Sequence, residues 1–316
     1  MAELFASSEP AVGFLQFLML GLVIGSLYAL IALGYTMVYG IIELINFAHG
    51  DLFMLGSFVA LGVAIWPMGV TSADAPTGAI MATVALMLLV TPVFCALLNV
   101  TVDRVVYRPL RQSPKLTVIV SAIGVSFIFM NIGLLWRGAT PVKFPDLIGD
   151  TNLLEGTGLR FTWEDLLVVA VTVPTMIALT LFVRYTTLGK AMRATAQNPV
   201  AAQLMGINVN QVIAVTFALG GALAGVASVI YGLYIKAVDY QMGFQNGLYA
   251  FTAAVLGGVG NIPGAVLGGL LIGVVGELSK AYLGAKWSEA VIFGILIVIL
   301  LFRPTGLLGA RTREKV

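Results

Sequence analysis

The sequence predicts an all-α, polytopic membrane protein with about eight or nine helical membrane segments in two similar halves, including broken or re-entrant segments. Of its 316 residues, 59% are hydrophobic and 10% are charged, whereas average soluble domains are about 45–50% apolar and about 25% charged. Apolar runs recur with the length of about 20 residues that a helix needs to cross a bilayer. Because no hydrophilic stretch is long enough to fold separately, residues 1–316 are expected to form one transmembrane domain.

Some of the apolar stretches are continuous and others are interrupted. The continuous ones are Val12–Ala32, Leu52–Trp66, Ala79–Val100, Leu116–Trp136, Leu166–Val183, Val212–Gly232 and Ala290–Phe302. Leu33–Ile45 is interrupted by Gly34, Gly40 and Glu43, and Leu248–Glu277 is split by the glycine-rich sequence 257–264. Irregular backbone at membrane depth is tolerated only inside protein or beside water. We therefore expect two broken segments, each buried or lining a cavity.

The distribution of lysine and arginine predicts which loops face the cytosol, because cytosolic loops carry an excess of basic residues. Residues 101–116, residues 184–210 and the C-terminal tail are rich in basic residues and poor in acids. The loop 137–165 instead contains several acids and should lie outside. This arrangement requires Leu248–Glu277 to enter the membrane and return, and it favours an N-terminus on the outside.

The order of these segments suggests an internal repeat. A span, a broken pair and another span occur at 12–32, 33–66 and 79–100, and again at 212–232, 248–277 and 290–302. Broken hydrophobic segments at matching positions in two halves indicate a substrate path. The break in the second half contains Gly257, Gly258, Gly260 and Asn261, which we expect either to line that path or to pack between helices.

A polar segment, residues 187–206 with the sequence TLGKAMRATAQNPVAAQLMG, lies between two long apolar spans. Its first part is rich in good helix formers. Asn198 and Pro199 suit the N-cap and first position of a second helix, and Gly206 suits its end. An ordinary solvated loop is one interpretation. The alanine-rich helical pair favours the other, in which the segment docks onto a cytosolic partner.

Polar residues also cluster near the end of the interrupted stretch Leu33–Ile45. Glu43, Asn46, His49 and Asp51 follow closely on one another in an otherwise apolar region. Ionisable groups in a bilayer are costly and are candidates for function. Asn46 and His49 could line the substrate path, or the cluster could form a helix–loop–helix corner. One histidine with two acids offers too few ligands for a convincing metal site, so no metal is expected.

The segment LGKAMRATAQNPVAAQLMGINV resembles the coupling segment of LivH-type permeases, which belong to ABC importers of branched-chain amino acids. Similar resemblance is found in Gly25–Phe58, Ala254–Gly273 and Leu300–Gly309, and it extends from about residue 12 to about residue 310. The positions that match the coupling element are Leu188, Gly189, Arg193, Ala194, Asn198, Pro199, Ala202 and Gly206.

The resemblance implies a permease that makes and breaks no covalent bond and lies in the bacterial cytoplasmic (inner) membrane. Its partners would be two cytosolic ABC ATPases, a second homologous permease (a LivM-like paralogue) and an extracytoplasmic amino-acid-binding protein. No phosphate-binding G-x-x-x-x-G-K-[ST] motif occurs in the sequence. ATP would therefore be hydrolysed by the partners, with no cofactor in this chain and no nucleic acid involved.

Two other functions remain open from the sequence. Related ABC permeases carry urea or short amides and share much of this pattern. An ion-coupled secondary transporter of amino acids could instead use Glu43, His49 or Asp51 to carry the ion, and would need no coupling segment.

Overall fold

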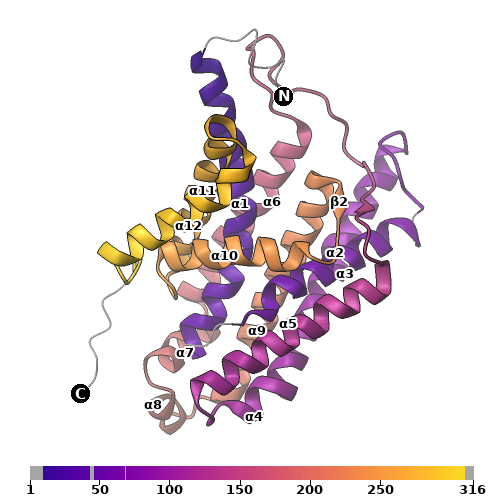
Figure 1. The fold of residues 1–316 in the computed structure, drawn as a ribbon. Helices are drawn as coiled ribbons and strands as arrows, with labels where there is room; N and C mark the ends of the chain where they lie inside the picture. Colours follow the sequence, from indigo (N-terminus) through magenta and orange to yellow (C-terminus); the bar gives the residue numbers. More distant parts are fainter. Residues whose placement is uncertain (1–9, 43–45, 68, 310–316) are drawn as a thin grey trace.

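The computed structural model describes residues 10–42, 46–67 and 69–309, and these are mostly helical (Figure 1). The helices are α1 (Pro10–Ile42), α2 (Ala48–Ile65), α3 (Thr77–Val102), α4 (Arg108–Leu110), α5 (Lys115–Arg137), α6 (Trp163–Tyr185), α7 (Thr187–Gln197), α8 (Pro199–Leu204), α9 (Val209–Ile235), α10 (Met242–Gly257), α11 (Ile262–Tyr282) and α12 (Ala285–Phe302). A π-helical turn, Asp103–Tyr107, joins α3 to α4, and β1 (Val142–Lys143) pairs with β2 (Ala237–Val238).

Eight helices in the described residues are long and apolar enough to cross a membrane. Seven of them are α1, α2, α5, α6, α9, α11 and α12. The eighth runs from α3 through the π-helical turn and α4. The predicted all-α, polytopic fold is therefore confirmed. The 16-residue α10 is a shorter segment that precedes α11. Counted with the eight spans, it gives the larger of the two expected numbers of membrane segments, eight or nine.

The predicted interruption of Leu33–Ile45 is wrong as far as residue 42. α1 is one helix of 33 residues that runs through Gly34 and Gly40 without a break. Both glycines serve close packing, because a Cβ on Gly34 would collide with the His49 ring and one on Gly40 would lie 3.1 Å from the Gly260 Cα. Glu43 lies outside the described residues.

The predicted break in Leu248–Glu277 is confirmed. α10 ends at Gly257 and α11 begins at Ile262. Asn261 caps the new helix, since its side-chain oxygen accepts a hydrogen bond of 3.0 Å from the Gly264 amide. Further along α11, Lys280 donates to Glu277 at 2.6 Å, which is the local pair expected from their spacing.

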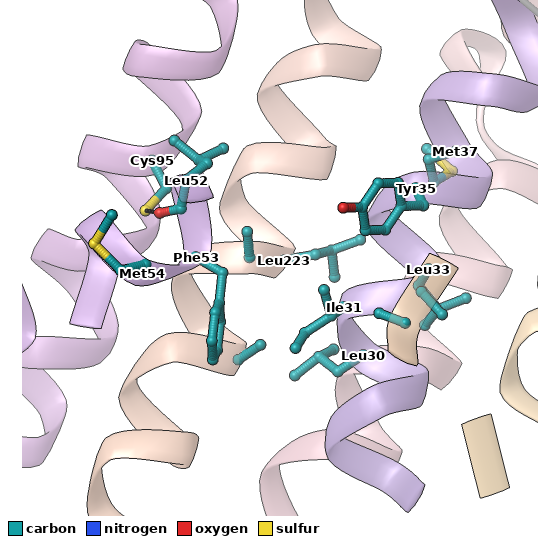
Figure 2. Close-up of a cluster of buried hydrophobic side chains, with 14 of the residues drawn as sticks. Leu30, Ile31, Leu33, Tyr35, Met37, Leu52, Phe53, Met54, Cys95 and Leu223 are labelled. Atoms are coloured by element: carbon teal, nitrogen blue, oxygen red, sulfur yellow. Dashed lines mark hydrogen bonds between the residues drawn. The ribbon is translucent and has the colours of Figure 1, made fainter. Parts of the chain in front are cut away.

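Two helix pairs are in backbone contact through small residues. Between α1 and α11, a Cβ on Gly25 would lie 2.8 Å from the Leu270 Cα. Between α3 and α9, a Cβ on Gly225 would lie 2.5 Å from the Pro92 Cα. In lipid, helices associate through such close approach, because hydrophobicity alone does not draw them together. The central core then forms where α1, α2, α3 and α9 meet, with Leu30, Phe53 and Leu223 among its side chains (Figure 2).

The helix contacts support the expected likeness of the two halves. α1 packs along α11 as α9 packs along α3, and α2 contacts α3 as α10 contacts α11. The matching units are therefore α1–α2–α3 and α9–α10–α11, with α2 and α10 as the equivalent short helices. This alignment differs from the predicted one, because α1 is not divided and the 290–302 span lies outside the repeat.

The structure separates two of the basic segments, residues 101–116 and 184–210, from the acidic loop (Figure 1). At one end lie α4, α7 and α8, and Arg111 donates to Asn210 at 2.7 Å. At the other end the acidic loop meets the start of α1, where Gln16 and Arg160 exchange hydrogen bonds of 2.9 and 2.7 Å. The excess of basic residues assigns the first end to the cytosol. α1 accordingly begins on the outside.

A lysine organises the outer end. Lys236 follows α9 in a left-handed conformation with φ 58°. Its ammonium group lies 2.6 Å from Glu164 and 3.1 Å from Asp146. Burial disfavours the charged lysine, but hydrogen bonds to Glu164 and Asp146 outweigh that effect and raise the pKa of Lys236. The ion pairs thus fix the β1–β2 connection above α9.

Replacing Lys236 tests this arrangement. Lys236→Met should lower the free energy of unfolding by about 1–2 kcal/mol, because it leaves the buried Glu164 unpaired. Lys236→Gly removes the same ion pairs but relieves the left-handed strain, so it should cost less. The ion-pair contribution should be constant at neutral pH, and it should fade as the pH rises through the raised pKa of the lysine and also in acid, as the Glu164 carboxylate takes up a proton. Thermal melting of both variants in detergent measures this, and a Lys236→Met protein as stable as the wild type would contradict it.

Candidate functional site

The cytosolic segment 187–206 forms the two short helices that the sequence predicts. Thr186 caps α7 by accepting a 3.0 Å hydrogen bond from the Gly189 amide. Asn198 caps α8 by accepting hydrogen bonds of 3.0 Å from the amides of Val200 and Ala201. Gly206, at φ 82°, ends the pair, in a conformation that favours glycine. The bend between the helices is thus fixed by local hydrogen bonds.

α7 is held firmly against the membrane helices α1, α6 and α9. Gly189 is buried against the end of α6, where a Cβ would collide with the Val183 carbonyl. Met192 is also buried, and Arg193 donates a hydrogen bond to the same carbonyl. α7 therefore moves with the ends of these spans rather than as a free loop.

α8 projects away from the membrane helices and presents apolar side chains. Leu204 and Met205 are each 83% exposed, and Val200 is 65% exposed. Only Ala202 of α8 is buried. Solvated loops seldom display an apolar cluster at a polar end, and such a cluster marks a protein contact. The sequence interpretation missed these three residues, although their spacing on a helix was readable.

The predicted coupling residues thus divide into two groups. Gly189 and Ala202 are buried, and Leu188 and Ala194 are half-buried, so these four attach the segment to the rest of the chain. Arg193, Asn198, Pro199 and Gly206 are exposed.

The coupling segment borders the break between α10 and α11. A pocket of about 100 Å³ lies between them, with Arg193 and Ala196 of α7 on one side and Gly260 on the other. Gly40 of α1 also lines it. A displacement of α7 would therefore change the packing at the break and at the cytosolic end of α1.

The other residues of the break are occupied by structural contacts. The amides of Leu307 and Leu308 donate to the carbonyls of Leu256 and Gly257 at 2.9 and 3.0 Å. Asn261 donates from its side chain to the Leu308 carbonyl at 2.6 Å. Gly258 lies directly against this C-terminal segment, where a Cβ would be 2.5 Å from the Gly309 amide nitrogen. These contacts favour packing, rather than substrate contact, for Gly257, Gly258 and Asn261.

Asn46 belongs to a buried polar network. Its amide donates to Asn99 at 3.3 Å, and its carbonyl accepts a 2.7 Å hydrogen bond from the Tyr107 hydroxyl. Asn99 in turn donates to the Phe217 carbonyl at 2.7 Å. Tyr107 comes from the π-helical turn, a rare element that redirects side chains and often marks functional sites. The network favours the helix–loop–helix corner over a substrate contact for Asn46.

His49 and Asp51 lie in the first turn of α2 and are each 1% exposed. The His49 ring packs edge-on against Tyr35, 4.7 Å between ring centres, and lies beside the backbone of Ile31. One oxygen of Asp51 accepts a hydrogen bond from Ser126 of α5, and the other has no partner. Among the described residues, no three histidine, cysteine or acidic side chains gather as a metal site would require.

A second pocket, of about 260 Å³, opens between α1, α5 and α10 close to Asp51. We call it the α5–α10 pocket. Its lining residues are Tyr35, Phe47, Ile123, Ser126, Phe127, Met130, Gly243, Phe244, Gly247, Leu248 and Phe251. The sequence interpretation missed this pocket, because only the tertiary fold brings α5 beside α10.

Comparison with known proteins agrees with the fold. Residues 17–300 match a family described as the permease component of the branched-chain amino acid transport system. The chain is 42% identical over 314 residues to the high-affinity branched-chain amino acid transport system permease protein LivH of Escherichia coli K12, covering 98% of this chain and 100% of that protein. It is 42% identical over 309 residues to the corresponding protein BraD of Pseudomonas aeruginosa, covering 96% of this chain and 98% of BraD.

A more distant relative is the autoinducer 2 import system permease protein LsrC of Escherichia coli O9:H4, 28% identical over 200 residues, which are 60% of this chain and 56% of LsrC. No solved structure matches. The fold and these likenesses define a multi-pass transport permease of the inner membrane. The chain belongs to the branched-chain amino acid transport permease family.

The Asn46 network makes a testable prediction. Tyr107→Phe should lower the free energy of unfolding by about 1–3 kcal/mol, because the buried Asn46 carbonyl loses its donor. Tyr185→Phe, at a position that is 64% exposed, is the matched control and should change little. Thermal unfolding of the purified proteins decides the matter, and equal stability of the two variants would show that the network does not support the corner.

Proposed function

We propose that this chain is a permease subunit of an ATP-driven importer that moves branched-chain or other hydrophobic amino acids into the cell. The observation that carries the proposal is the apolar surface of Val200 and Leu204 on α8 and Met205 directly after it, at the cytosolic end of the fold. The substrate class follows from the names of LivH and BraD, which are similar to the chain over nearly their full length. Residues 1–316 would act as one permease domain.

The partners follow from this surface and from the sequence. A cytosolic ATPase would receive α8, and a second homologous permease with its own ATPase would complete the membrane pair. An extracytoplasmic binding protein would deliver the amino acid to the outer end, where Lys236 and the acidic loop lie. Because the sequence lacks a phosphate-binding loop, the partner subunits would hydrolyse ATP, and this chain would need no cofactor of its own.

The contacts of α7 suggest how ATPase movement reaches the membrane. A push on α8 passes through the fixed bend at Asn198 to α7, which is attached to α1, α6 and α9. α7 also borders the break at Gly260. Since α1 and α11 are in backbone contact, a shift at the cytosolic end of α1 carries α11 with it. Leu188, Gly189, Arg193, Ala194, Asn198, Pro199, Ala202 and Gly206 form this coupling element.

We propose that the residues named from the sequence contribute to the substrate path in two ways. Gly260 lines the small pocket beside α7. His49 contacts Tyr35, which lines the larger pocket between α5 and α10. Asn46, Gly257, Gly258 and Asn261 act in our proposal indirectly, by shaping the corner and the break beside the path.

Replacement of Leu204 tests the docking surface. Leu204→Glu should reduce the amount of ATPase that copurifies, and with it ATP-dependent leucine uptake, by at least about tenfold. Such a loss corresponds to removing one central contact of an interface. Leu204→Met keeps an apolar side chain and should behave like the wild type. Because the position is 83% exposed, neither variant should disturb folding.

The assay would use the complete transporter in proteoliposomes, with size-exclusion chromatography as the check on folding. Normal ATPase recovery and uptake in Leu204→Glu would remove the docking assignment. Ala194→Trp, at the half-buried side of α7, should separate the two events by weakening transport while α8 still binds the ATPase.

A further inference from the structure

The α5–α10 pocket combines apolar walls with one concealed acidic group. Its walls come mainly from Ile123, Phe127, Phe244 and Phe251. Phe127 and Phe244 are each 57% exposed, so the pocket opens on a face that the single chain leaves uncovered. A cavity of about 260 Å³ is suited to a small molecule rather than to a peptide.

The acidic group is Asp51, which lies directly behind the pocket wall. Ser126, which lines the pocket, donates a hydrogen bond to one carboxylate oxygen. The other oxygen, Oδ1, would be 2.8 Å from a Cβ on Gly243, another lining residue. With only a hydrogen atom in place of a side chain, Gly243 lets α10 lie directly against Asp51, and this one glycine separates the buried oxygen from the cavity. Gly247, one turn later, keeps the same face of α10 free of bulk.

Asp51 lacks the partner that a buried carboxylate requires. Oδ1 makes no hydrogen bond, and in the described part of the chain no lysine or arginine pairs with this residue. His49, two positions earlier, points to another side of α2, towards Gly34 and Tyr35. Leaving an acidic group unpaired within a bilayer is costly, and such residues default to functional roles. A cation from outside this chain would supply the missing partner.

The depth of Asp51 suits a transported molecule. A Cβ on Gly34 would meet both the His49 ring and the carbonyl of Gly220, which lies near the middle of α9. Asp51 follows in the next positions of α2, so it lies near the middle of the membrane. Substrate sites of transporters built from repeats lie at this level, between the repeats. The α5–α10 pocket is bordered by α10 and by α1, which come from different halves.

We propose that Asp51 binds the α-ammonium group of a hydrophobic amino acid, whose aliphatic side chain lies against the walls of the α5–α10 pocket. This inference rests on the proposed function and assigns its substrate contacts. An inorganic cation fits the pocket less well, because Ser126 is the one hydroxyl beside Asp51 among the lining residues, apart from the Tyr35 phenol. Ser126 holds the carboxylate in place, and α5 and α10 provide the selectivity for apolar side chains.

The experiment uses the complete transporter in nanodiscs without its binding protein, so that the membrane site is observed alone. The probe is a photoreactive diazirine analogue of leucine with free ammonium and carboxylate groups. Labelling should map to α5 and α10, near Phe127 and Phe244. Leucine and isoamylamine, which both carry the ammonium group, should compete. 4-Methylpentanoate, which lacks it, should compete at least about tenfold less well, the difference expected for one charge-assisted hydrogen bond.

Three variants make the test specific to Asp51. Asp51→Asn keeps the shape of the side chain and should reduce labelling by about tenfold or more. Ser57→Ala lies on the same helix, facing Ser228 rather than the pocket, and should label like the wild type. Phe244→Ala alters an exposed wall residue and should weaken labelling even if Asp51→Asn proves too unstable to purify.

The outcomes separate this inference from the proposed function. If the wild-type transporter takes up leucine with ATP but Asp51→Asn labels like Ser57→Ala, the ammonium site is wrong and the importer stands. Equal competition by 4-methylpentanoate and isoamylamine would also overturn the site. If the wild type shows no ATP-dependent leucine uptake, the proposed function fails, whereas the competition pattern still reports on Asp51.

Discussion

Backbone contact between α1 and α11, and between α3 and α9, is the constraint on which the rest of this structure depends. At Gly25 and Gly225 a single added carbon would lie 2.8 and 2.5 Å from the neighbouring backbone. Helices this close cannot slide independently, and in lipid no hydrophobic force would otherwise hold them together. The contacts therefore fix where the short helices α2 and α10 must lie, and so where the chain places its polar residues at membrane depth.

This constraint also explains how a cytosolic event can reach the membrane interior. α7 is tied to α6 by the Val183 carbonyl and shares a small pocket with the break at Gly260. The break is not a loose loop, because the C-terminal segment around Leu308 binds its backbone and Asn261 caps the next helix. α7, the break and α1 form one connected body. α8 alone stands out from it, with an apolar surface that a partner can hold.

Local signals in the sequence predicted the local features well. Asn198–Pro199 and Gly206 gave the two helices of the coupling segment, and the glycine-rich break at 257–264 separated α10 from α11. The interruption assigned to Gly34 and Gly40 was wrong, because a glycine in a membrane helix can serve a neighbour's approach instead of a turn. The α5–α10 pocket could not be predicted, since Ser126 and Gly243 meet Asp51 only through the tertiary fold.

The central claim is that this permease works as part of an ATP-driven assembly, and the most direct measurement is its composition in native membranes. The tagged chain would be purified in mild detergent from cells that take up leucine through it, and the copurifying proteins identified by mass spectrometry. Our account predicts cytosolic ABC ATPases and a second permease in fixed proportion to the chain. Recovery of the chain alone, from membranes in which it remains active, would contradict that account.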